Sequence, residues 1–425
     1  MTLTRIIDSF GSVWLIFWFS FFAVYIHFGG RAFAGLVLYL GPVAWLVWAV
    51  NRNKVPIISR DLVICAVAFG LFFLWLGMSE QWNALGIDQN YDKAGETAYR
   101  LAGEMALIAA LPAYILTRTA WRRTVLSQIL MSMALAGVAV MALDVWSGYG
   151  INTYIYPDGA ETDLNLRQGV AEMDIGRGHV IYAVITPLFL ALFATLLPRR
   201  WRWPAALYFI AAIVIGTMLN RLAIVPVIML AAAPLFYLGY KSPLWGLRLS
   251  LGTLAASILF APLVGLASRL AGEGVMARLP MSWDHRLRMW DYALTRISEA
   301  PLIGKGLDSS RNFQESFTTR IGVDVPFISL HPHNIGLQTW MEAGLIGAVL
   351  FTLAIVSLYF PLRRLTGDHA WRGAAVSGLI MSVAVASAVT VGAWQFWWWG
   401  LIGWSLTLVL LIPTEMKLSP HDITD

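Results

Sequence analysis

The sequence has one cysteine and few charged residues. Cys65 is the only cysteine among 425 residues, which excludes an internal disulfide and a metal site built from several thiolates. Lys, Arg, Asp and Glu together make up 13% of the chain, about half the share found in ordinary soluble domains. The net charge of +5 is too small to indicate a nucleic-acid partner.

Hydrophobic residues are abundant instead, at 58% of the chain, and include 20 Trp. About twelve apolar runs approach the length that spans a bilayer, and we expect the first to be retained because no small-residue cleavage site follows it. The sequence therefore predicts an all-α polytopic membrane protein, with residues 1–425 as one integral membrane domain. The runs lie near residues 12–28, 33–50, 61–77, 99–116, 125–145, 179–197, 203–219, 222–239, 245–268, 334–360, 371–393 and 396–413.

Basic residues in alternate loops predict the orientation of these helices. They gather on the side that holds both chain ends, which the positive-inside rule assigns to the cytoplasm. The loops of the opposite side are acidic, apart from the long segment 269–332 between the ninth and tenth predicted helices. The basic residues of the cytoplasmic loops include Arg52, Arg60, Arg118, Arg122, Arg123, Arg199, Arg200, Arg202, Arg363 and Arg364.

The outer segment 269–332 carries eight basic residues. This excess predicts an external anion, and the alternative is that the arginines pair with local acids or reach lipid headgroups. Apolar side chains at steps of three and four predict an amphipathic helix at about 283–299, lying at the membrane interface. The apolar stripe is Trp283, Leu287, Trp290, Leu294 and Ile297, and the basic residues are Arg269, Arg278, Arg286, Arg288, Arg296, Lys305, Arg311 and Arg320.

Polar side chains gather where the tenth predicted helix begins. His331 and His333 flank a proline, which favours an extended entry, so the helix should start near Asn334, and this residue can cap it. Gln338 and Glu342 follow on the side of the helix that His333 would share. A purely structural membrane helix needs none of these groups, and we therefore predict a functional site here.

Arg221 is another unexpected residue, since it lies between two apolar runs joined by a tight outer turn. A guanidinium at that depth is costly unless it faces a cavity or an anion. Arginines and a histidine on the outer face suit a polyprenyl-linked sugar donor, whose diphosphate needs fixed cations. A neutral histidine could deprotonate an acceptor hydroxyl while the arginines stabilise the departing diphosphate. A structural histidine or a proton relay is the alternative.

Two pairs of outer carboxylates could instead bind a divalent metal. They are Glu161 with Asp163 and Glu172 with Asp174. A solvated acidic loop is the simpler explanation, and the outer loops contain no Asp-x-Asp. We therefore predict neither a metal nor a cofactor.

Three motifs stand out: His333-Asn334, nine residues, then Gly344-x-x-Gly347; Arg286-x-x-x-Trp290 with Pro301-Leu-Ile-Gly304-x-Gly306; and Thr217-x-x-Asn220-Arg221. The first resembles the signature of bacterial O-antigen ligases, within the wider family shared with O-antigen polymerases and some protein O-oligosaccharyltransferases. The second resembles the family's Arg-x-x-x-Trp and glycine turn. The third resembles its Thr-x-Ser-Arg, with one extra residue and Asn in place of Ser.

The resemblance implies a GT-C type glycosyltransferase with its active site at the periplasmic face of the bacterial inner membrane. Such ligases transfer the O-antigen glycan from undecaprenyl diphosphate to lipid A–core, among membrane lipid, with inversion and without metal. By residue match His333 would be the general base, and Arg221 with either Arg286 or Arg288 would bind the diphosphate. Further candidates for substrate binding are His331, which either orients His333 or contacts sugar, Asn334 and Gln338.

Three other functions are alternatives. An O-antigen polymerase would use the same donor with a carrier-linked glycan as acceptor, and a protein O-oligosaccharyltransferase would use a protein. A transporter of lipid-linked glycans would need polar groups along a path through the bundle. Ionisable residues inside the predicted helices are few, Glu104 and Asp144 being examples, which favours an enzyme.

Overall fold

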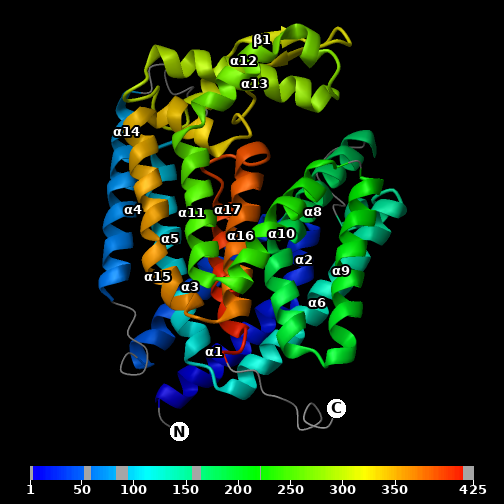
Figure 1. The fold of residues 1–425 in the computed structure, drawn as a ribbon, viewed down its shortest axis with the longest axis vertical. Coiled ribbons are helices and arrows are strands. Elements are labelled where there is room, and N and C mark those ends of the chain that lie inside the picture. The colour runs from blue at the N-terminus through cyan, green and yellow to red at the C-terminus, as the bar shows by residue number, and fades with distance from the viewer. Residues whose placement is uncertain (1–2, 52–58, 83–93, 156–163, 221, 415–425) are drawn as a thin grey trace.

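The computed structural model describes residues 3–51, 59–82, 94–155, 164–220 and 222–414 (Figure 1). In this part of the chain nine helices are long and apolar enough to cross a membrane, and ten spans result if the bent pair α11–α12 is counted as one. The predicted all-α polytopic membrane fold is therefore confirmed.

The described chain is almost entirely helical. Its first half contains α1 (Leu3–Ser20), α2 (Phe22–His27), α3 (Ala32–Asn51), α4 (Arg60–Ser79), η1 (Glu80–Trp82), α5 (Ala94–Leu116), α6 (Ala120–Trp146), α7 (Gly150–Ile155), α8 (Leu164–Leu196) and α9 (Arg199–Leu219). Its second half contains α10 (Ile224–Lys241), α11 (Pro243–Leu259), α12 (Pro262–Met276), α13 (Met281–Glu299), η2 (Ser309–Asn312), β1 (Ser316–Thr318), β2 (Asp324–Pro326), α14 (Ile335–Ser357), α15 (Tyr359–Thr366), α16 (Ala370–Val389), α17 (Phe396–Leu408) and η3 (Val409–Leu411). The first predicted span corresponds to α1 and α2, and the last to α17 and η3.

The ninth predicted span, 245–268, is not one straight helix. α11 ends at Leu259, α12 begins at Pro262, and the two are bent by 63°. Proline has no N–H to continue the hydrogen-bond ladder of a helix, but it fits the first turn, where no such bond is made. The bend carries α12 over the end of the bundle (Figure 1).

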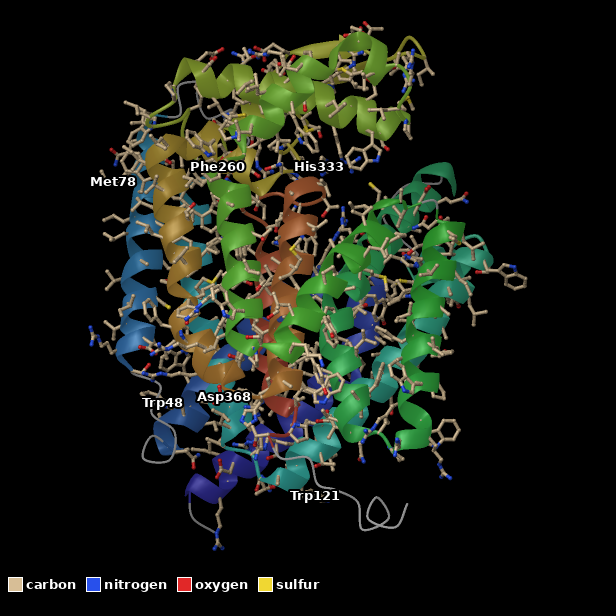
Figure 2. The ribbon with its side chains drawn as sticks, in the orientation of Figure 1. Trp48, Met78, Trp121, Phe260, His333 and Asp368 are labelled. Carbon is tan, nitrogen blue, oxygen red and sulfur yellow. The ribbon has the colours of Figure 1, made fainter. Side chains whose placement is uncertain are left out.

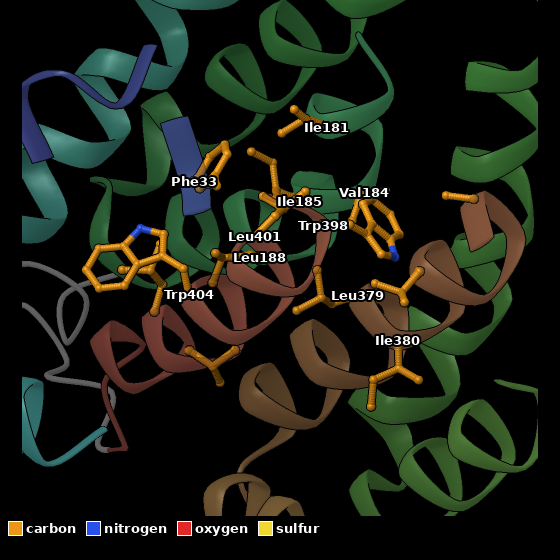
Figure 3. Packing of buried hydrophobic residues seen from close by; sticks show 14 of the residues in the cluster. Phe33, Ile181, Val184, Ile185, Leu188, Leu379, Ile380, Trp398, Leu401 and Trp404 are labelled. Atoms are coloured by element: carbon orange, nitrogen blue, oxygen red, sulfur yellow. The ribbon is translucent and has the colours of Figure 1, made fainter. Parts of the chain in front are cut away.

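Large buried side chains fill the centre of the bundle. Trp398 and Trp404 of α17 are almost completely buried, and they lie among aliphatic residues of α8 and α16 (Figure 3). α8 and α16 are also the most enclosed of the candidate spans. These side chains belong to one continuous buried cluster. Close van der Waals packing of this kind holds helices together in lipid, where the hydrophobic effect between helices is absent.

A separate layer, which we call the cap (residues 262–332), covers one end of the bundle (Figure 1). It consists of α12, α13 and the antiparallel pair β1–β2. α13 lies where the sequence predicts an amphipathic helix, and its Trp290 and Ile297 are buried in a cluster with Leu337 and Met341 of α14. The apolar stripe thus packs on protein, and its position at the membrane interface stays a prediction.

Candidate active site

His333 lies beneath the cap, where the chain enters α14 (Figure 2), and His331 is the second-last residue of the cap. Asn334 is extended, and its side chain accepts a hydrogen bond from the N–H three residues later at 2.9 Å, so it caps the helix as the sequence predicts. From the other side, the indole of Trp290 donates to the carbonyl of Pro332 at 2.9 Å. The cap and the helix therefore hold the histidine segment between them.

His333 has an unusual backbone conformation. Its φ is +52°, in the left-handed region that costs a non-glycine residue free energy and is frequent at functional sites. Its ring Nδ1 lies 3.0 Å from the carbonyl oxygen of Thr390. Because a carbonyl only accepts, the ring donates through Nδ1, and in the neutral ring Nε2 keeps its lone pair.

Both imidazoles are kept neutral by their surroundings. Burial lowers the pKa of His333, and the charge of Arg286 lowers it further, while the bond to a carbonyl opposes the shift. Burial lowers the pKa of His331 to about 3, and the charges of His333, Arg311 and Arg177 act in the same direction. At neutral pH the Nε2 atom of His333 is therefore an uncharged acceptor suited to a general base.

His331 uses both of its ring nitrogens within the protein. Its Nδ1 accepts a hydrogen bond from the N–H of His333 at 3.1 Å, so the neutral ring carries its proton on Nε2. That atom lies 3.0 Å from the side-chain nitrogen of Gln395. The Gln395 oxygen can accept the proton once the amide is turned by 180°, since the two ends of an amide are assigned from the hydrogen bonds they make. These bonds favour the orienting role for His331 over contact with sugar.

Most basic residues of the outer segment are neutralised by nearby carboxylates. Arg288 pairs with Glu273 at 2.5 Å and with Asp284 at 2.9 Å, so the geometry does not favour it as a substrate-binding residue. Other ion pairs involve Arg269, Arg296, Lys305, Arg311 and Arg320. Local ion pairs thus account for most of the cations of segment 269–332, as in the alternative that the sequence left open, and these residues need no external anion.

Arg286 has different surroundings from Arg288. Its guanidinium donates to the carbonyls of Val389 at 3.1 Å and Ser282 at 3.0 Å. Within the described part of the chain it forms no ion pair, and burial lowers its pKa. Val389 directly precedes the residue whose carbonyl receives the His333 ring, so Arg286 and His333 are held by neighbouring carbonyls. Of the two arginines that the sequence leaves open, the geometry favours Arg286.

Arg221 lies outside the described residues, and its role in binding diphosphate stays a prediction. The residue before it, Asn220, is buried, and its side-chain oxygen accepts a hydrogen bond from the hydroxyl of Tyr149 at 2.6 Å.

Arg177 of α8 is a site residue that the sequence analysis missed. Its charge lowers the pKa of both His331 and His333, although it is more than 150 residues away in sequence. It also pairs with Asp174 at 2.7 Å. An arginine at the outer end of a predicted span was the available signal, since ionisable groups there are often functional.

The acidic pairs do not form a metal site in the part of the chain that the structure describes. Asp174 is fully buried and pairs with Arg177 and with Arg31, while Glu172 is exposed. Glu161 and Asp163 lie outside the described residues. Among the described residues no group of three or more His, Cys, Asp or Glu side chains could hold a metal ion.

Glu342 is the centre of a buried network behind the histidines. Its carboxylate accepts hydrogen bonds from the N–H of Asp308 at 2.6 Å, the hydroxyl of Ser310 at 2.5 Å, the amide of Gln338 at 3.0 Å and the indole of Trp394 at 2.6 Å. These donors come from the cap, from α14 and from the segment after α16. Glu342 thus joins the three parts of the chain that surround the histidines.

Gln338 and Asn334 use their side chains within the protein. The oxygen of Gln338 accepts from the N–H of Ala393 at 2.7 Å, its nitrogen donates to Glu342, and both Gln338 and Asn334 are almost fully buried. Contact of Gln338 with substrate is not favoured by this geometry, because both groups of its amide are bonded within the protein. Asn334 uses only its oxygen in the cap, and its contact with substrate stays a prediction. They support the segments that carry His333 and Thr390.

α14 is interrupted at Gly344, where φ is +67°. The three carbonyls before the break, at residues 341–343, accept from two backbone N–H groups of the turn 301–306, at 2.9 and 2.8 Å, and from the indole of Trp75 at 2.9 Å. The turn from the cap therefore satisfies the backbone groups that the break exposes.

Glycine is required on both sides of this joint. A Cβ atom added to Gly344 would lie 2.4 Å from the backbone of Leu302, and one added to Gly304 would lie 2.4 Å from the backbone of Glu342. The two glycine motifs of the sequence are thus the two halves of one backbone contact. It fixes the distance between the cap and the helix that carries the site.

Comparisons with known proteins single out the same part of the chain as the site. A family model described as O-antigen ligase matches residues 206–352, a range that contains Arg221, Arg286 and His333. A protein of Rickettsia bellii named "Putative polysaccharide ligase" is 24% identical over 293 residues, which cover 68% of each chain. Similarly named proteins of Rickettsia conorii and Rickettsia felis are 28% identical over 179 residues and 29% identical over 175 residues, covering 41% and 40% of this chain and 42% of each relative.

The family model covers the part of the chain where the fold brings the cap, the kinked helix and the histidines together, and the relatives' names indicate polysaccharide ligation in general. This chain is therefore a multi-pass membrane protein that is similar to the O-antigen ligase family over residues 206–352 and to proteins named as polysaccharide ligases over a wider part of its length.

Proposed function

We propose that this protein transfers an O-antigen glycan from undecaprenyl diphosphate to lipid A–core at the periplasmic face of the inner membrane. The strongest support for the proposal comes from His333 and Arg286. The Nε2 atom of His333 is an uncharged acceptor on a strained residue, and its neighbour Arg286 forms no ion pair among the described residues.

In the proposed reaction His333 acts as the general base. Its Nε2 takes the proton from an acceptor hydroxyl of lipid A–core as that oxygen attacks the anomeric carbon of the donor. The new glycosidic bond forms as the bond between the anomeric carbon and the diphosphate oxygen breaks, with inversion at that carbon. Undecaprenyl diphosphate leaves with the electron pair, and His333 leaves the step as an imidazolium. The Thr390 carbonyl, which accepts from Nδ1, favours this charged ring.

The arginines stabilise the charge of the departing diphosphate. Arg286 offers guanidinium N–H groups without a competing carboxylate among the described residues, and Arg221 joins it by residue match. Arg177 acts on both histidines and Arg311 on His331, each from within an ion pair. Arginine binds phosphate oxygens through two parallel N–H groups, so the transition state needs no metal ion.

The other polar residues position this machinery. His331 orients the backbone of His333, while Asn334 caps α14 and Gln338 holds the segment after α16. Arg288 is a structural residue of the cap in this account, since both of its acidic partners lie there.

The test uses the purified full-length protein with an undecaprenyl-diphosphate glycan and two possible acceptors, lipid A–core and a second donor molecule. We expect lipid A–core to gain the glycan and His333→Ala to abolish the transfer. His369→Ala, a change at the start of α16, is the matched control and should transfer normally. Elongation of the carrier-linked glycan instead would replace the ligase proposal by a polymerase, and full transfer by His333→Ala would remove the proposed base.

A further inference from the structure

The end of the bundle opposite His333 contains a pocket that the proposed reaction does not use. Its volume is about 230 Å³, and it lies between α1 and the start of α6. Trp121 marks this end in Figure 2, far from the label of His333. The pocket also lies outside the residues that the O-antigen ligase model matches.

One wall of the pocket is cationic and rigid. Arg118 is 3% exposed, and its guanidinium donates to the backbone carbonyl of Asp8 at 2.7 Å and to its carboxylate at 3.1 Å. The Ser12 hydroxyl accepts from Arg118 at 2.7 Å and from Arg122 at 2.6 Å. Two guanidinium groups are thus locked around one hydroxyl, so this wall is organised before any ligand binds.

The charges of this wall do not balance. Asp8 compensates Arg118, whereas Arg122 forms no ion pair with any residue in the described chain. Its guanidinium lines the pocket and is tied by one nitrogen only to Ser12. Arg122 also lies in the first turn of α6, where the free N–H groups of the helix add positive potential. The pocket therefore favours an anion that accepts hydrogen bonds from arginine.

The other wall of the pocket is apolar and faces outward. Val13 and Ile16 of α1 are 66% and 39% exposed, and Val125 and Leu126 of α6 line the same space. In a multi-pass membrane protein such exposed aliphatic side chains face lipid chains. Trp121, 73% exposed at the rim, has the amphipathic ring typical of the level of the lipid headgroups.

We propose that this pocket binds an anionic glycerophospholipid, with its phosphate on Arg122 and its acyl chains along Val13 and Ile16. A cationic end joined to an apolar, outward-facing wall matches the two ends of such a molecule. Arginine suits phosphate oxygens because its planar group can donate two bonds at once. A free phosphate would use the cationic wall alone, and the apolar wall distinguishes the two ligands.

The proposal can be tested on the full-length protein in nanodiscs of phosphatidylcholine to which phosphatidylglycerol of the same acyl chains is added. We expect phosphatidylglycerol to bind specifically and to raise the melting temperature. Arg122→Gln should weaken this binding about tenfold, the share of one charge-assisted arginine–phosphate contact. The control is Arg200→Gln, which removes the same charge from an arginine that stacks on Trp201, and it should bind as the wild type does.

A second variant tests the apolar wall. Ile16→Ser changes an exposed side chain, so the fold should tolerate it, and it should also weaken the binding of phosphatidylglycerol. Inorganic phosphate should not raise the melting temperature. Equal binding by wild type, Arg122→Gln and Ile16→Ser would overturn the proposal, and so would an equal rise in melting temperature with inorganic phosphate.

Discussion

Glu342→Gln tests whether the buried network behind the histidines controls the geometry of catalysis. The four hydrogen bonds to the carboxylate fall into two pairs, with Ser310 and Gln338 on one oxygen and the Asp308 N–H and Trp394 on the other. A glutamine keeps the shape of the side chain but provides only one oxygen. Its new amide group therefore faces two former donors.

The cost of this change follows from the partners. The least costly orientation places the new amide beside Ser310, whose hydroxyl can turn and accept, and beside Gln338, whose amide then loses its acceptor. Losing one buried hydrogen bond to a charged group costs about 2 kcal/mol. If the activation free energy of transfer rises by the same amount, the transfer rate falls about thirtyfold, since each 1.36 kcal/mol is a factor of about ten. Glu342→Ala would leave all four donors without an acceptor, about 4–12 kcal/mol, enough to unfold a domain.

The assay is single-turnover transfer from undecaprenyl-diphosphate glycan to lipid A–core, measured against pH. We expect Glu342→Gln to be inserted and folded but slow. The acid limb of its pH–rate profile should move to higher pH, toward the ordinary pKa of histidine. A loosened segment at Thr390 would let water reach His333 and so reverse the lowering of its pKa by burial. Asp61→Asn is the matched control, since Asp61 is also a buried carboxylate, paired with Arg364 at 2.7 Å, and has no contact with the site network. A Glu342→Gln protein with the wild-type rate and the wild-type acid limb would refute the reasoning.

Four other predictions can be checked independently. The wild-type rate should stay constant down to about pH 6.5 and fall only below it, because the base must be unprotonated and its surroundings lower the pKa of His333; an acid limb above that value would contradict this. Arg286→Ala should raise the donor KM while Arg288→Ala should not, and steady-state kinetics at varied donor concentration will separate them. Gly344→Ala should lower the free energy of unfolding by about 2 kcal/mol or more, measured by denaturation in detergent, whereas Gly70→Ala, which meets no atom within 4 Å, should be neutral or stabilising. Transfer should persist in excess chelator, and its loss would indicate a metal-dependent mechanism.

Local patterns in the sequence predict the class of fold and the position of the main motif. Runs of apolar residues mark most of the spans because a helix that crosses lipid must be apolar over its own length. The span predicted over 245–268 is bent near Pro262, a local signal to which the prediction from the length of the apolar run gave no weight. The start of α14 at Asn334 was predictable because a capping residue acts on its own first turn.

Roles within the site were less predictable. The sequence left Arg286 and Arg288 as alternatives, because an ion pair with Glu273 depends on a contact between α12 and α13 that no helical spacing reveals. Arg177 was missed because it is more than 150 residues from His333 in the sequence, and only the packing of α8 beside the histidine segment brings the two close together. Gln338 was assigned to substrate binding since it adjoins His333, although the fold bonds both groups of its amide within the protein.

The sequence by itself determined that this is an all-α membrane protein with a long basic segment at 269–332 and a histidine at the start of a helix. These properties follow from composition and from spacings within single helices, where each residue acts on neighbours three or four positions away. Only the tertiary structure decided which of Arg286 and Arg288 has an ion pair among the described residues, which nitrogen of His333 is the acceptor, and why Gly304 and Gly344 are both needed. Those features depend on contacts within a few ångströms between groups from distant parts of the chain. Local sequence patterns do not predict such long-range contacts.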